Sequence, residues 1–336
     1  MNNITESMIL DHSEGEVLLS PNGDGRILIE SKLLDQKTVF SCTSSYSVEL
    51  IKLILSVKGP SWLCDEIMRE ESPHYVQKAL DSMLFSFLRP EDFSGKRILD
   101  FGCGSGASTA IMARVLPKTE IVGVELVQKL LDIANARISQ QSLGDRVKLL
   151  LSPSPDRLPE DIGQFDFIVC SALVEHLLPS ERRIILAKLW TLLKPGGVLL
   201  INQTPNRWSC VEFHSTSGFL FINYVPDSLA YLILRTFSRR NKGKSWEEML
   251  RGGVRGSSVK EVMKLLKGVD AYPPRLLNPL PGKGRNDINL WYSSTSTLSK
   301  RSLRVKKWIR LSAYIFWPLR KFILPSIVVV VSKART

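Results

Sequence analysis

Three glycines at alternate positions, Gly102, Gly104 and Gly106, separate a short apolar segment from a helical one. The apolar segment, residues 98–101, contains one acidic residue, Asp100. Glycine permits tight backbone angles and lets a ligand approach the main chain where a Cβ atom would collide. Unpaired N–H groups at the start of the following helix point toward whatever lies above the turn. The pattern therefore predicts a strand, a ligand-binding turn and a helix in succession.

A second acidic residue, Glu125, closes the next predicted strand, residues 120–125. At the tip of a strand beside the glycine turn, a carboxylate can accept hydrogen bonds from two ribose hydroxyls. A dinucleotide site would need the spacing G-x-G-x-x-G and a cradle for pyrophosphate, whereas the spacing here is G-x-G-x-G. Asp100 suits a ligand that carries an amine. A dehydrogenase is therefore disfavoured, and a glycine turn without a ligand is the remaining structural alternative.

Residues 100–106, Asp-Phe-Gly-Cys-Gly-Ser-Gly, resemble the first motif of the class I S-adenosylmethionine-dependent methyltransferases, L-D-x-G-C-G-x-G. The resemblance is specific over residues 95–206, where it extends to an F-D-x-I segment at 165–168 and to Leu-Leu-Lys-Pro-Gly-Gly at 192–197. It implies an α/β fold with a doubly wound, mostly parallel, seven-stranded sheet and helices on both faces. It also implies S-adenosylmethionine as the cofactor.

The resemblance assigns roles to individual residues. Asp100 and the backbone of the glycine turn would hold the methionyl end, Glu125 the ribose, and Leu126 one face of the adenine. The exit of the fourth strand, Cys170 and Ser171, would face the sulfonium. The candidate cofactor-binding residues are Asp100, Phe101, Gly102, Cys103, Gly104, Gly106, Glu125, Leu126, Ser154 and Ser171.

One position departs from the family pattern. Many relatives place an acid after the third strand, where it accepts a hydrogen bond from the adenine amino group. In the segment 151–159 this position holds Ser154, whose hydroxyl accepts less strongly than a charged group. Asp156 would substitute if Pro153 and Pro155 redirect the loop. The departure is the one feature that favours a scaffold that keeps the fold without the cofactor.

The residues that act on the acceptor are harder to identify, because such an enzyme mainly supplies proximity and alignment. A hydroxyl acceptor must lose its proton, and His176, His214 and Glu175 are the candidate bases. The pair Glu175-His176 follows the predicted fourth strand, and some quinone-pathway relatives have a similar pair. Arg207, on the same loop as His214, is the candidate for an anionic substrate group. Loop orientation for His176 and a solvated side chain for Arg207 are the structural alternatives.

Strand and helix signals alternate from residue 96 to 204, which is typical of a doubly wound parallel sheet. The C-terminal β-branched segment is predicted as the last, antiparallel strand. The predicted strands are 97–101, 120–125, 147–152, 165–171, 198–204 and 326–333. The predicted helices are 105–115, 126–140 and 180–193, the last with Ser180 as its N-cap.

The flanking segments suggest four parts. Residues 1–60 form a small β-rich extension, with a hairpin around Asn-Gly-Asp-Gly at 22–25. Residues 61–206 hold a helical lead-in and the cofactor-binding core. Residues 207–290 are a lid or substrate insertion, in which 272–284 is predicted as loop, and residues 291–336 hold a basic aromatic helix and the final strand.

Cysteine usage and the N-terminus indicate the compartment. Five scattered cysteines without C-x-x-C spacing argue for a reducing compartment, and against a disulfide framework or a structural zinc site. Only Cys42 would remain of a zinc-ribbon-like ligand set in the extension, so we expect no metal. The first residues lack the basic start and apolar run of a signal peptide, so we expect a cytoplasmic protein.

Positive charge is concentrated in the last third of the chain. Residues 231–336 hold 23 Lys and Arg against 5 Asp and Glu, a net charge of +18, which leaves −6 for the rest. This asymmetry indicates an anionic neighbour, either a membrane surface or a nucleic acid. Charges and prolines interrupt 309–331, which argues against a membrane span. The basic aromatic segment 304–322 would lie on a membrane surface or pack on the sheet with its charges at the rim.

The acceptor class is narrowed by a missing motif. Methyltransferases that act on amino groups of nucleic acid bases usually carry [N/D]-P-P-[Y/F] after the fourth strand, where a flipped base is gripped. Residues 171–174 here are Ser-Ala-Leu-Val. We therefore expect a small-molecule or lipid-linked acceptor, methylated at oxygen, with the enzyme peripheral at a membrane. The alternatives are an RNA methyltransferase with a carbon or oxygen target, and the cofactor-less scaffold.

Overall fold

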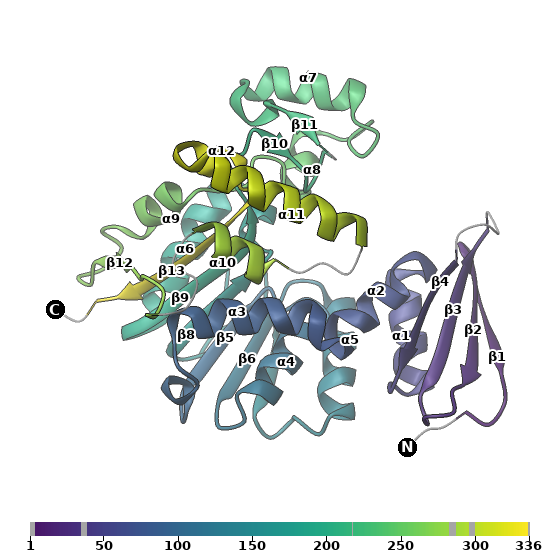
Figure 1. Ribbon diagram of the computed structural model, residues 1–336. Coiled ribbons are helices and arrows are strands. Elements are labelled where there is room, and N and C mark those ends of the chain that lie inside the picture. The colour runs from purple at the N-terminus through teal and green to yellow at the C-terminus, as the bar shows by residue number, and fades with distance from the viewer. Residues whose placement is uncertain (1–3, 35–38, 217, 282–286, 296–299, 335–336) are drawn as a thin grey trace.

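The computed structural model describes residues 4–34, 39–216, 218–281, 287–295 and 300–334. Its centre is a seven-stranded sheet in the order β12-β13-β9-β8-β5-β6-β7 (Figure 1). The strand β13 pairs antiparallel with β12 and β9, and the pairs from β9 to β7 are parallel. The expected seven-stranded, mostly parallel α/β sheet is thus confirmed. Its strands are β5 (Arg97–Phe101), β6 (Glu120–Glu125), β7 (Val147–Leu151), β8 (Phe165–Ser171), β9 (Leu193–Pro205), β12 (Pro274–Leu276) and β13 (Ser326–Lys333).

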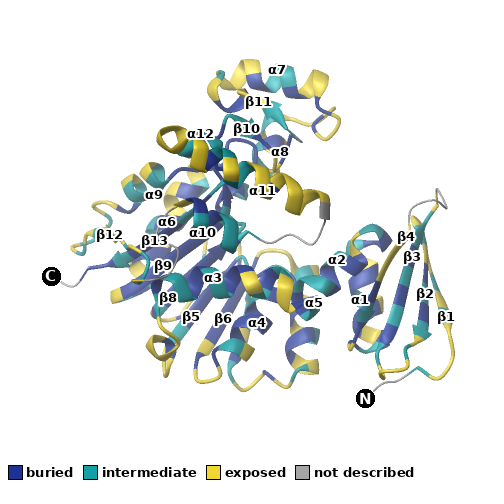
Figure 2. Cartoon of the chain, in the orientation of Figure 1, coloured by how far each residue is buried: buried dark blue, intermediate teal, exposed yellow. Residues whose placement is uncertain are grey.

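Helices cover both faces of this sheet, which is why most side chains of its central strands are apolar. On one face lie η1 (Pro73–Gln77), α3 (Lys78–Phe87), α4 (Ala107–Val115) and α10 (Asp287–Ser294). On the other face lie α6 (Pro179–Leu192) and α9 (Val259–Leu266). Figure 2 shows the central strands buried between these layers.

Two helices begin later than predicted. The helix α4 begins at residue 107 and α5 (Gln128–Gln140) at residue 128, each two residues after the expected start. In the first case Gly106 has φ +81° and serves as the N-cap, so the glycine turn is longer than its sequence suggested. A left-handed residue belongs to the turn and not to the helix.

The helix α6 and the strand β12 also correct the sequence analysis. The N-cap of α6 is Leu178 and not Ser180, because Pro179 takes the first helical position and the Glu181 carboxylate accepts from the Leu178 N–H at 3.0 Å. The segment predicted as loop contains β12, which begins with Pro274 and, among the described strands, pairs with β13 alone. At the first position of an edge strand, a proline costs no ladder hydrogen bond.

The N-terminal part of the chain is a separate layer beside the sheet (Figure 1). Four antiparallel strands pair in sequence order, and the predicted hairpin around residues 22–25 joins the second to the third. Two helices that the sequence analysis did not predict, α1 (Val48–Lys58) and α2 (Pro60–Glu71), connect this sheet to the core. The strands are β1 (Met8–His12), β2 (Gly15–Pro21), β3 (Ile27–Leu33) and β4 (Val39–Ser44).

An insertion follows β9 and lies beyond the carboxyl ends of the strands (Figure 1). It contains the short pair β10 (Val211–Glu212) and β11 (Phe219–Leu220), then η4 (Ile222–Tyr224), α7 (Asp227–Phe237) and α8 (Trp246–Arg251). It is fastened to α6 by Arg182, which donates to the Gly256 carbonyl at 2.8 Å and to Glu261 at 2.9 Å. Buried charge-assisted bonds of this kind fix the orientation of the insertion over the core.

The tail forms α11 (Lys300–Ile315), η5 (Trp317–Leu319) and α12 (Arg320–Ile323). The helix α11 packs on α10, where Arg310 donates to Asn289 at 2.9 Å and lies over the Tyr292 ring. Its outer side is exposed, including Trp308 at 69% (Figure 2). Among the described residues, no helix combines the length and the apolar character that a membrane crossing requires.

A buried ionic cluster joins the N-terminal part to the core. Arg137, fully buried on α5, donates to the Tyr46 hydroxyl at 3.0 Å and to the Ser105 carbonyl at 2.8 Å. It also pairs with the Glu66 carboxylate of α2 at 3.0 Å. Burial acts to raise the pKa of Glu66, but Arg137 and Lys58 outweigh it and hold that pKa below its usual range.

The first prediction concerns this cluster. Replacing Arg137 by Met should lower the free energy of unfolding by about 3–5 kcal/mol, because buried Glu66 loses the nearer of its cationic partners and keeps only the half-exposed Lys58. Arg183, exposed on α6, offers a matched control, and Arg183→Met should change it by less than about 0.5 kcal/mol. Urea unfolding followed by circular dichroism measures both. Equal midpoints for the two variants would contradict a structural role for Arg137.

Candidate functional site

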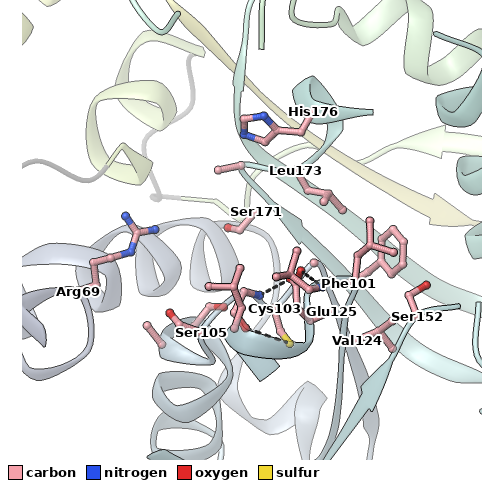
Figure 3. Close-up of a pocket in the computed structure, with 18 of the residues that line it drawn as sticks. Arg69, Phe101, Cys103, Ser105, Val124, Glu125, Ser152, Ser171, Leu173 and His176 are labelled. Carbon is pink, nitrogen blue, oxygen red and sulfur yellow. Dashed lines mark hydrogen bonds between the residues drawn. The ribbon is translucent and has the colours of Figure 1, made fainter. Parts of the chain in front are cut away.

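A cavity of about 600 Å³ opens at the carboxyl ends of β5, β6 and β8. The glycine turn and Glu125 form one wall, and Ser171 and His176 lie toward the other end (Figure 3). The helix α2 closes a third side with Trp62 and Arg69. This edge is the usual ligand position in open α/β sheets. No sequence motif had indicated the contribution of α2.

The three glycines of the turn have different reasons to be glycine. All have positive φ, at +78°, +57° and +81° for Gly102, Gly104 and Gly106. A Cβ atom on Gly102 would lie 2.5 Å from Leu173 Cδ1, and one on Gly106 would lie 2.7 Å from Ala134 Cβ. A Cβ atom on Gly104 would meet nothing within 4 Å. Packing therefore requires glycine at 106, where the neighbour is the rigid Ala134, whereas at 102 the Leu173 side chain can shift and Gly104 leaves open space at the cavity wall.

Glu125 ties the tip of β6 to the glycine turn. Its carboxylate accepts from the Gly104 N–H and from the Val127 N–H, each at 2.9 Å (Figure 3). A carboxylate has about four lone-pair sites, so two more hydrogen bonds can be accepted. Glu125 lines the cavity, as predicted from its place at the strand tip.

Asp100 lies behind the turn and is not among the residues that line the cavity. One carboxylate oxygen accepts from the Ser108 hydroxyl at 2.8 Å and from the Thr109 hydroxyl at 2.6 Å. Burial raises the pKa of Asp100 despite these hydrogen bonds. The contacts shown are with the first turn of α4, and the expected contact with a ligand amine stays a prediction.

The wall beyond Glu125 is formed by Leu126 and the loop after β7. Leu126 is 42% exposed and lines the cavity together with Ser154. The Ser154 hydroxyl donates to Asp156 at 2.7 Å. The loop thus brings the serine to the cavity and keeps the aspartate behind it. Asp156 is not among the lining residues, so the structure places Ser154 at the position that the sequence analysis anchored.

The three candidate bases come together. Glu175 and His176 lie in η3 (Val174–His176) directly after β8, and His214 comes from the turn after β10. One carboxylate oxygen of Glu175 and one ring nitrogen from each histidine lie within 4.8 Å of one another. Gly253 allows this approach, because a Cβ atom there would lie 2.7 Å from His214 Cδ2 and 3.4 Å from Glu175 Cγ.

Hydrogen bonds fix the orientation of His176. Its Nδ1 lies 2.6 Å from the Arg251 carbonyl oxygen. Because a carbonyl oxygen only accepts, Nδ1 carries the proton and Nε2 faces the Glu175 carboxylate, 3.9 Å away. Arg251 is held in turn by two hydrogen bonds to Glu181, at 2.9 and 2.7 Å.

Glu175 is fully buried, and its two oxygens have different surroundings. Oε2 accepts from the Thr204 hydroxyl at 3.1 Å, whereas Oε1 has no hydrogen-bond partner among the described residues. Burial raises the pKa of Glu175 although His176 acts to lower it. Burial and the neighbouring His176 both lower the pKa of His214.

Two expected residues lie elsewhere. Arg207 donates to the Asn223 carbonyl and borders a second cavity of about 190 Å³. Leu177 borders both cavities, but Arg207 is not among the residues that line the main one. Cys170, expected to face the sulfonium, is fully buried among core side chains. Side chains alternate along β8, so only Ser171 reaches the cavity.

Comparison with known proteins identifies the core. Residues 98–197 match the family model described as a methyltransferase domain. The core of this chain is a class I methyltransferase domain. S-adenosylmethionine is the cofactor of this class.

Curated relatives match this chain over part of its length. The ubiquinone biosynthesis O-methyltransferase of Acinetobacter baylyi is 30% identical over 118 residues, 34% of this chain and 48% of that protein. The mitochondrial ubiquinone biosynthesis O-methyltransferase of Saccharomyces cerevisiae is 29% identical over 149 residues, 44% of this chain and 42% of that protein. The chain thus spans about half the length of these relatives.

Among solved structures, a putative sarcosine dimethylglycine methyltransferase from Galdieria sulphuraria superposes with a TM-score of 0.44 at 16% identity. The superposition covers 72% of this chain and 79% of that one. At this level of similarity it adds nothing to the description of the site.

The methyltransferase core fits its cofactor in three respects. The cavity volume lies in the range of about 300–1,000 Å³ that small-molecule sites occupy. Gly104 leaves the space that a Cβ atom would fill. Glu125, already turned toward the glycine loop, has acceptor sites to spare.

The second prediction separates the roles of two glycines. Both Gly104→Ala and Gly106→Ala place a side chain at positive φ, which costs about 1–2 kcal/mol. Gly106→Ala should cost about 1–3 kcal/mol more, since its methyl group overlaps Ala134. Thermal and urea unfolding of the two variants measure the difference. Equal stability would show that α4 and α5 are not packed as closely as the structure has them.

Proposed function

We propose that this chain transfers the methyl group of S-adenosylmethionine to a hydroxyl oxygen of a small-molecule or lipid-linked acceptor. The observation that carries the proposal is one cavity with two different ends. One end has the glycine turn and Glu125, and the other has His176, backed by Glu175 and His214. The first end suits a cofactor and the second suits an acceptor that must lose a proton.

When bound, S-adenosylmethionine supplies a methyl group on a positively charged sulfur. The glycine turn would hold the methionyl end of the cofactor and Glu125 its ribose, and Ser171 stands at the exit of β8 between Glu125 and His176 (Figure 3). Alignment of an acceptor oxygen with the methyl carbon is the main contribution of such a site. As the new oxygen–carbon bond forms and the sulfur–carbon bond breaks, the hydroxyl proton must leave.

The cluster of Glu175, His176 and His214 supports oxygen as the acceptor atom. Carboxylate and imidazole groups assist the loss of a hydroxyl proton near neutral pH. His176 Nε2 is free of the tautomeric proton and belongs to a residue that lines the cavity. The two relatives described above are O-methyltransferases by name, which agrees with this choice.

The tail supports a lipid-linked acceptor. On α11 and η5, exposed apolar side chains alternate with Lys and Arg, and Ile315 and Phe316 are 64% and 54% exposed. Basic helices with exposed tryptophan and aliphatic residues bind anionic membrane surfaces. The enzyme would then meet an amphiphilic acceptor at the membrane in which that acceptor resides. Among the described residues, no contact favours RNA over an anionic membrane as the partner of this tail.

The third prediction tests the cofactor. S-Adenosylhomocysteine titrated calorimetrically into the protein should bind, and Glu125→Ala should weaken binding at least about tenfold, or about 1.4 kcal/mol. Gly104→Arg should abolish it, because the arginine would enter the cavity. Glu120→Ala, at the other end of β6, is the matched control and should bind as wild type. Folded wild-type protein that does not bind would favour the scaffold.

The fourth prediction tests the membrane surface. The protein should float with vesicles of anionic phospholipid and not with vesicles of phosphatidylcholine alone. Trp308→Ser combined with Phe316→Ser should reduce the floating fraction severalfold, because both side chains are exposed and apolar. Trp62→Ser removes an equally exposed tryptophan from α2 and should leave flotation unchanged. Flotation without lipid-charge dependence, or unaffected by the double variant, would exclude this surface.

A further inference from the structure

Two hydrogen-bond acceptors lie close together at the acceptor end of the cavity, which His176 lines and behind which Glu175 is buried. Glu175 Oε1 is buried without a hydrogen-bond partner among the described residues, and His176 Nε2 lies 3.9 Å from it. The His176 proton is on Nδ1, where it is donated to the Arg251 carbonyl. Glu175 Oε1 is the buried one of these two acceptors, and a buried acceptor without a donor is costly. A cation between them removes that cost.

His214 directs a third ligating atom to the same space. The three candidate ligand atoms lie within 4.8 Å of one another. In a tetrahedral zinc site with bonds of about 2.1 Å, ligand atoms lie about 3.4 Å apart. Metal binding therefore requires these atoms to move closer together than they lie here. Two histidines and a glutamate, with the fourth position open, are one of the ligand sets of catalytic zinc.

The surrounding contacts hold each ligand as metal ligands are held. The His176 Nδ1–H donates to a backbone carbonyl, the usual outer partner of a ligating histidine. The Thr204 hydroxyl donates to the other Glu175 oxygen. The Glu212 carboxylate accepts from the backbone N–H groups of residues 214, 215 and 216, which fixes the turn that carries His214.

We propose that Glu175, His176 and His214 bind a divalent transition-metal ion of the zinc type at the acceptor end of the cavity. Metal binding itself does not depend on the proposed function, but the use of the ion does. An ion here would bind the acceptor hydroxyl and lower its pKa, so that the proton passes to water before the oxygen attacks the methyl carbon. The acceptor class is then a hydroxyl compound able to bind a cation.

The expectation of no metal was based on the cysteines and on the absence of a local spacing motif. His214 lies in the insertion, far in sequence from the Glu-His pair, so only the fold brings the three side chains together. The sequence analysis named all three residues but gave them separate roles as bases.

The experiment uses the full chain after treatment with a chelator and its removal. Zinc chloride is titrated calorimetrically, and bound zinc is counted by elemental analysis. Wild type should bind one zinc ion per chain, and thermal unfolding should shift upward with zinc. Glu175→Gln and His214→Asn should each weaken binding by more than the roughly 10–100-fold that loss of an outer partner causes. His74→Asn replaces an exposed histidine elsewhere and is the matched control.

Binding of S-adenosylhomocysteine is measured on the same preparations to separate this proposal from the proposed function. Unchanged cofactor binding in Glu175→Gln and His214→Asn, with zinc binding lost, would support the metal site. Failure of wild type to bind zinc while it binds S-adenosylhomocysteine would overturn the metal site alone. Zinc binding that both variants retain would overturn it as well, because the ion would then lie elsewhere.

Discussion

The buried pairing of Arg137 with Glu66 is the interaction on which the site depends. The same guanidinium that neutralises Glu66 donates to the carbonyl of Ser105, inside the glycine turn. A buried ion pair is rarely a net source of stability, because both groups lose their hydration. Here the ion pair fixes the position of α2 relative to the glycine turn. The cavity wall that carries Trp62 and Arg69 therefore has a fixed position relative to the cofactor end.

The cofactor end was predictable because its chemistry is local in sequence. Strand, turn and helix follow one another within a short segment, and Glu125 lies at the tip of the neighbouring strand. The prediction was less accurate where the direction of a side chain or a backbone angle determines whether a residue reaches the cavity or where a helix begins. Cys170 faces the core because side chains alternate along β8, and the φ angle of Gly106 delays the start of α4. The strand β12 has three residues, which are too few to show an alternation of apolar and polar side chains.

The spatial arrangement of residues at the acceptor end was not predictable from the sequence, because the insertion brings residues from distant parts of the chain together there. Ser257 donates from its N–H to the Pro205 carbonyl at 2.9 Å, and Arg207 donates in the same way to Ser257 at 2.8 Å. Through these contacts residue 257 of the insertion returns to the end of β9, beside the point where the insertion leaves the sheet. Gly256 must be glycine, since a Cβ atom there would lie 2.1 Å from the Pro205 oxygen. His214 and the Arg251 carbonyl reach His176 only through this return.

The tail is attached to the same end of the molecule. The Asn206 side chain, directly after β9, donates to the carbonyls of Lys321 and Leu324 at 2.7 and 2.9 Å. Cys210 donates from its N–H to the Phe322 carbonyl at 2.8 Å. These contacts fasten α12 and the residue after it to the start of the insertion, next to the exposed basic surface of α11 and η5. A change in the acceptor can be accommodated in the insertion and tail together, while Arg137 keeps the cofactor end unchanged.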